Sequence, residues 1–247
     1  MQNSMEENSL VEKTYQIVQA LWVFIILFVG CSLGFDNARI HSLNIEAKRN
    51  YGRGVQYARE READRAIESF TKSIEIDPSA AAYNGRAAEY LMKGWFEDAV
   101  SDASRAIMLN EKYAISYFNR GCAYYKMGDF NRALKEFTRA VYLDDGQAEF
   151  YFNLAQTYVR LGLEDEALGM YGRTLERNPH YYAAYYNRAC LYSQMRKFPE
   201  AIANLEMAVK EGFADVERMK REPALEKIRN TPAFNILLQK LGSKPKK

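Results

Sequence analysis

The stretch YFNRGCAYYKMGDFNRALKEFTRAVYLDD, residues 117–145, is the clearest copy of a pattern that recurs along the chain. Residues 50–54 (NYGRG) align with residues 117–121 (YFNRG), and the same alignment extends to five units. The units begin at Ala47, Ala80, Ala114, Ala148 and Tyr182, at spacings of 33, 34, 34 and 34 residues. In arrays of this period each unit buries its apolar face only against its neighbours, which predicts a solenoid.

In its period and its fixed small residues, the array resembles the tetratricopeptide repeat (TPR) family, whose unit is a 34-residue helix-turn-helix. Small residues are needed where two antiparallel helices approach closely. They stand here at the eighth position (Gly54, Ala87, Gly121, Ala155, Ala189) and, as alanine, at the twentieth (Ala66, Ala99, Ala133, Ala167, Ala201). The resemblance implies an all-α fold, a right-handed superhelix of helix-turn-helix repeats.

The same resemblance implies a division of the chain into segments. The repeats are expected at 47–79, 80–113, 114–147, 148–181 and 182–213, capping helices at 214–241, and a basic tail at 242–247. Thr231-Pro232 is typical of a helix start, with threonine as N-cap and proline in the first turn. Residues 31–46 are expected to be a linker or a short lead-in helix.

Glycines mark the predicted turn between the two helices of a unit. Gly94, Gly128 and Gly162 stand where the first helix ends, a place that favours a left-handed backbone. Arg61 and Arg196 occupy this place in the outer units, so their turns are predicted to differ.

The amino terminus is apolar and contains one cysteine. Residues 14–35 hold no charged residue, and the apolar run 20–30 has the length of a signal-peptide core. It ends in FVGCS, residues 28–32, which resembles a bacterial lipobox and implies lipidation of Cys31. Residues 1–30 are then a cleaved signal, and the protein is a lipoprotein of the cell envelope.

Two other interpretations of this segment stay open. Residues 17–35 are long enough for an uncleaved membrane anchor, and the excess of basic residues after it would keep the repeats in the cytoplasm. The segment could also be a buried core helix. Only the lipobox interpretation gives Cys31 a chemical role.

Composition and motifs exclude several function classes. The net charge of +2 is too small for a dominant nucleic-acid role. The three cysteines and two histidines form no cluster with metal-ligand spacing, so neither a metal nor another cofactor is expected. Phosphate-loop and nucleophile motifs are absent, and repeats fill every segment long enough for a catalytic domain. The protein is therefore predicted not to be an enzyme.

In the TPR family the first helices line a concave groove that binds peptides. Carried over, its contact positions assign the groove to Asn84, Phe118, Asn119, Tyr125, Lys126, Phe152, Asn153, Gln156, Arg160, Tyr186 and Asn187. The asparagines could instead support the solenoid, and the basic residues could be a solvated helix face. Tyr51 and Val55 do not match the carboxylate clamp of co-chaperone domains, which argues against chaperone tails as ligands.

The sequence thus predicts a scaffold that is tethered to a bacterial envelope membrane and docks extended segments of partner proteins. The alternative is an anchored assembly factor or regulator that faces the cytoplasm. A homo-oligomer is compatible with either. Cys122 and Cys190 both fall at the ninth position, two repeats apart, and are predicted to remain free thiols because four helix steps exceed disulfide reach.

Overall fold

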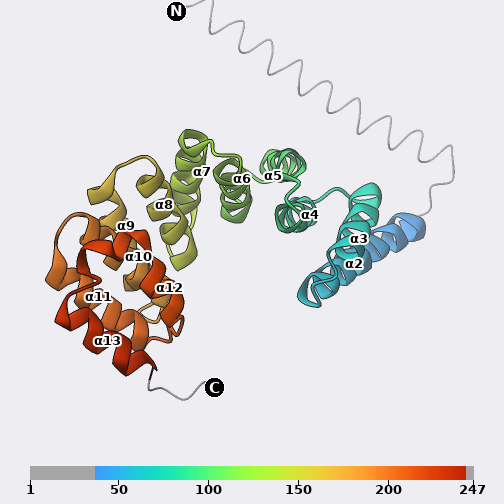
Figure 1. Ribbon diagram of the computed structural model, residues 1–247. Coiled ribbons are helices and arrows are strands. Elements are labelled where there is room, and N and C mark those ends of the chain that lie inside the picture. The colour runs from blue at the N-terminus through green and yellow to red at the C-terminus, as the bar shows by residue number, and fades with distance from the viewer. Residues whose placement is uncertain (1–36, 243–247) are drawn as a thin grey trace, which may run out of the picture.

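The computed structural model describes residues 37–242, and every regular element in this range is a helix. Consecutive helices pair in order along the chain, and each pair packs against the next. Figure 1 shows the pairs in a curved row, with α8, α10 and α12 towards its inner side. The all-α solenoid predicted from the repeat is confirmed.

Each of the five units contributes two helices, and three further helices follow them. The helices are α2 (Asn37–Arg59) and α3 (Ala63–Ile76), α4 (Ala80–Lys93) and α5 (Phe96–Leu109), α6 (Ala114–Lys126) and α7 (Phe130–Leu143), α8 (Ala148–Arg160) and α9 (Glu164–Arg177), α10 (Tyr182–Gln194) and α11 (Phe198–Lys210), then α12 (Val216–Arg221), η1 (Pro223–Ile228) and α13 (Pro232–Gly242). Helix α2 begins inside the range 31–46, which the sequence assigned to a linker or lead-in helix. Cys31, the segment 1–30 and residues 243–247 lie outside the described residues.

The turn inside each unit has the same backbone in all five copies. Gly94, Gly128 and Gly162 have φ values of 78°, 82° and 74°, as their position at the helix end predicts. Arg61 and Arg196 adopt φ values of 62° and 61° at the equivalent place, so the prediction that their turns differ is wrong. The packing of the two helices therefore imposes the left-handed conformation even on residues that disfavour it.

Two adjacent rows of side-chain pairs hold the two helices of a unit together. In each pair the partners are sixteen residues apart, one on each helix. At the eighth position Gly121 meets Phe137, and a Cβ atom added to Gly121 would lie 2.8 Å from the Phe137 ring. At the seventh position Arg86 donates to both carboxylate oxygens of Asp102, at 2.6 and 2.9 Å.

In the second row, at the seventh position, the type of side-chain pair differs from unit to unit. Arg120 donates to Glu136 at 2.9 and 3.0 Å, and Arg188 donates to Asn204 at 2.7 Å. In the fourth unit the equivalent residues are Leu154 and Met170, which join an apolar cluster. Both polar and apolar pairs thus occur at this position.

Candidate functional site

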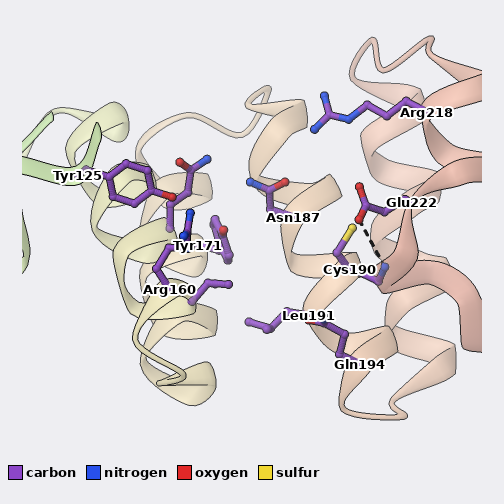
Figure 2. A pocket seen from close by; sticks show the side chains of 12 residues that line it. Tyr125, Arg160, Tyr171, Asn187, Cys190, Leu191, Gln194, Arg218 and Glu222 are labelled. Carbon is purple, nitrogen blue, oxygen red and sulfur yellow. Dashed lines mark hydrogen bonds between the residues drawn. The ribbon is translucent and has the colours of Figure 1, made fainter. Parts of the chain in front are cut away.

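A cleft of about 330 Å³ lies between α8 and α10, on the inner side of the curve (Figure 2). We call it the α8–α10 cleft. Helices α6 and α8 supply one wall, α10 the other, and the C-terminal cap, residues 214–241, adds a third side. The lining residues are Tyr125, Gln156, Val159, Arg160, Tyr171, Asn187, Cys190, Leu191, Gln194, Arg218, Glu222 and Ala224.

Asn187 of α10 and Tyr171 of α9 both line the cleft. The Asn187 side chain lies near enough to the Tyr171 hydroxyl to affect its pKa. Burial raises the pKa of this Tyr171 hydroxyl, while the neighbouring Asn187 amide acts in the opposite direction. Tyr171 therefore stays neutral at ordinary pH.

The cap contributes the charged side of the cleft. The Glu222 carboxylate accepts from the backbone N–H of Ala224 at 3.4 Å and from the Tyr186 hydroxyl at 3.5 Å. The Arg218 guanidinium lies 5.0 Å from the centroid of the Tyr186 ring. On the opposite wall, Arg160 stacks over Phe130 at 4.4 Å.

Four of the eleven residues predicted for the groove line this cleft, namely Tyr125, Gln156, Arg160 and Asn187. Lys126 is exposed at the end of α6, next to Tyr125 but not part of the lining. These four predicted contact residues thus come together at one end of the solenoid.

The predicted aromatic anchors instead pack inside the protein. Phe118 is buried and stacks on Phe150 of the next unit at 4.7 Å. Tyr186 is buried and stacks on Phe213 at 4.5 Å. Phe152 is half-buried, with its ring 4.9 Å from that of Tyr181. These rings stabilise contacts between units and offer little surface to a ligand.

The predicted groove asparagines lie in different environments. Asn84 and Asn119 are both buried, and the Asn84 side-chain oxygen accepts from Asn119 at 3.0 Å and from Ser116 at 3.1 Å. Asn153 is half-buried and donates to the backbone of its own helix. Only Asn187 among these asparagines faces the cleft.

We therefore expect Asn119→Ala and Asn153→Ala to differ. Asn119→Ala removes one of the two donors to a buried oxygen and should lower the free energy of unfolding by about 1–2 kcal/mol. Asn153→Ala removes only a local bond at a more accessible site and should cost less than about 0.5 kcal/mol. Urea unfolding of the two variants checks this, and equal losses would contradict it.

Sequence reasoning missed much of the cleft, including Gln194, Arg218 and Glu222. Gln194 could have been predicted from the repeat, because this residue occupies the thirteenth position of its unit, as Lys126 and Arg160 do in theirs. Arg218 and Glu222 follow the last full unit, so no repeat position indicated them.

Cys122 and Cys190 are free, as predicted, and Cys190 lines the cleft. Burial raises the pKa of each thiol to about 12. Their thiolate fractions at pH 8 are then roughly a thousand-fold below that of an exposed cysteine.

We accordingly expect iodoacetamide at pH 8 to alkylate both cysteines at least about 100-fold more slowly in the native protein than in denaturant. Peptide mapping by mass spectrometry distinguishes them from Cys31. Rapid labelling of native Cys190 would show that its thiol is accessible and ionised.

Neither a metal site nor a membrane span occurs in the described part of the chain. Residues 37–242 contain no group of three potential metal ligands among histidine, cysteine and carboxylate side chains. None of the helices in this range is both long and apolar enough to cross a bilayer.

Comparisons with known proteins agree with the helical repeat. Family models described as TPR repeat and tetratricopeptide repeat match residues 121–162, 148–181 and 170–203. Among solved structures, PilF of Pseudomonas aeruginosa is similar with a TM-score of 0.70 at 17% identity, covering 81% of this chain and 90% of that one.

Two further structures share the fold. YrrB, described as a TPR protein with an unusual peptide-binding site, has a TM-score of 0.54 at 24% identity over 66% of this chain and 84% of its own. MamA has a TM-score of 0.58 at 23% identity over 64% and 93%. With its helix pairs, its recurring turn and these family matches, the protein is a tetratricopeptide-repeat protein, built as a protein-interaction scaffold.

Proposed function

We propose that the protein docks extended segments of partner proteins along its inner face, with the α8–α10 cleft as the principal contact. The observation that carries this proposal is the convergence of Tyr125, Gln156, Arg160 and Asn187 on one cleft. Amide side chains there offer both donors and acceptors to a peptide backbone. The peptide-binding site named for YrrB supports this use of the fold by analogy.

Site-specific photocrosslinking tests the docking site. A photoreactive residue in place of Gln156 should crosslink to a linear segment of a partner, and a synthetic peptide of that segment should compete. The same residue in place of exposed Lys135 on α7 is the control. Equal crosslinking from both positions, or failure of the peptide to compete, would move the binding site away from the cleft.

We further propose that the scaffold is tethered to a bacterial envelope membrane through lipidated Cys31. The support is the apolar run 20–30 followed by the lipobox-like residues 28–32. More than one acyl chain would give stable anchoring. Proteins of this fold are generally scaffolds rather than enzymes, which fits a tethered adaptor.

Metabolic labelling with a fatty acid tests the tether. Label should enter the wild-type protein and be absent from Cys31→Ser, and the intact mass should exclude residues 1–30. An unlabelled protein whose mass includes residues 1–30 would favour the alternative, an uncleaved anchor with an assembly factor or regulator on its cytoplasmic side.

A further inference from the structure

The C-terminal cap is a sixth unit whose first helix is broken. Helix α12 begins at Val216, 34 residues after the fifth unit begins at Tyr182, and α13 follows in the place of a second helix. Pro223 stands at the eighth position, where the full units have glycine or alanine. A proline disfavours the helical conformation of the residue before it, and Glu222 is extended, with φ −60° and ψ 114°.

The broken helix is nevertheless firmly packed. Met219, Leu225 and Ile228 are fully buried and share one apolar cluster with Tyr186 and Phe234. Phe234 belongs to α13, whose N-terminus is capped by the Thr231 hydroxyl, as the sequence predicts. The cap is therefore a fixed part of the structure, and the residues that it places at the cleft are held in position.

The cap brings charge to the cleft but leaves one cation without a counterion. Glu222 is already engaged by Ala224 and Tyr186. Among the described residues, the Arg218 guanidinium forms no ion pair with a carboxylate, and neither does that of Arg160 on the opposite wall. Figure 2 shows the Arg218 side chain above Asn187, extending towards the open part of the cleft.

Both arginines are exposed, and neither is held by a carboxylate of residues 37–242, unlike three others in the protein. Arg86, Arg120 and Arg177 each pair with a carboxylate, from Asp102, Glu136 and Asp145 respectively. An accessible guanidinium can bind a carboxylate through two parallel hydrogen bonds. The two unpaired arginines therefore favour an anionic occupant.

We propose that Arg218 binds the side-chain carboxylate of an aspartate or glutamate within the docked segment. Arg160 adds positive potential from the other wall, and Asn187 and Gln156 bind the backbone beside the acidic residue. A volume of about 330 Å³ admits one side chain with its adjoining backbone. The inference rests on the proposed docking function and assigns its specificity to the cap.

A pool of random nonapeptides, acetylated and amidated so that the ends carry no charge, tests the proposal. Peptides retained by the immobilised full-length protein are sequenced by mass spectrometry. We expect Asp and Glu to be enriched about tenfold at one position, as a charge-pair contribution of ordinary size would give. Arg218→Gln should reduce this enrichment at least threefold, and 0.5 M NaCl should weaken it.

Arg221→Gln is the matched control, because Arg221 lies on the same helix with an 83% exposed side chain. It should leave the acidic preference unchanged, and Arg218→Lys should restore part of it. Circular dichroism verifies that each variant is folded. An equal loss in Arg221→Gln would contradict the proposal, since the general charge of the cap would then explain the preference.

Two outcomes separate this inference from the docking function. Peptides retained without acidic preference would contradict the role of Arg218 and leave docking in the cleft intact. Absence of any retained peptide on the native protein would contradict the docking function itself, and the inference with it.

Discussion

Asp102→Ala is expected to lower the free energy of unfolding by about 3–5 kcal/mol. The Asp102 carboxylate is buried and binds the Arg86 guanidinium through two bonds, while Thr71 of the preceding unit accepts a third from Arg86 at 2.9 Å. This hydrogen bond from Arg86 to Asp102 is also the largest cause that raises the pKa of Arg86. Without the carboxylate, a half-buried guanidinium loses its counterion and cannot deprotonate.

The fourth unit supplies the control for this prediction. It has Leu154 and Met170 at the positions of Arg86 and Asp102. The double variant Arg86→Leu/Asp102→Met copies that pair and should be within about 1 kcal/mol of wild type, because apolar pairs of similar volume often replace buried ion pairs without loss. Urea unfolding of the single and double variants measures the coupling. A double variant as unstable as Asp102→Ala would show that the two units are not equivalent there.

The sequence predicted the fold well because the same fold-determining residues recur in all five units. The small residues at positions eight and twenty recur in every unit, so one altered copy leaves the pattern visible. The turns at Arg61 and Arg196 show the limit of local reasoning. Arginine disfavours the left-handed backbone by a small amount, and the packing of the two helices of the unit outweighs that local cost.

The candidate site was less predictable because it depends on contacts between units. Phe118 occupies a family contact position, yet its ring stacks on Phe150 of the following unit. Asn84 is likewise buried, and its side-chain oxygen accepts a hydrogen bond from Asn119 rather than from a ligand. A position number describes a residue within its own unit. It does not tell whether a side chain of the neighbouring unit covers that residue. Arg218 lay beyond the last unit, and only the break at Pro223 brings it to the cleft.

Phe137→Ala is expected to cost about 3–5 kcal/mol, with a fall in melting temperature of roughly 10 °C. The Phe137 ring is fully buried, and its centroid lies 5.6 Å from that of Phe118 in the central core cluster. Alanine would leave a cavity that neighbouring units can refill only by shifting. Tyr142→Ala on the same helix, where the side chain is 77% exposed, should change stability by less than about 0.5 kcal/mol.

Gly121, which packs against Phe137 from the other helix of the unit, allows the cause of this loss of stability to be tested. Gly121→Ala would bring a Cβ atom to 2.8 Å from the stiff ring and should itself cost about 1–3 kcal/mol. The fifth unit combines Ala189 with Leu205 at the same two positions. Gly121→Ala/Phe137→Leu should therefore lose less than the sum of its two single variants in calorimetry. Additive losses would mean that the ring and the glycine do not pack as a pair, and that Phe137 stabilises the protein through its contacts with neighbouring units alone.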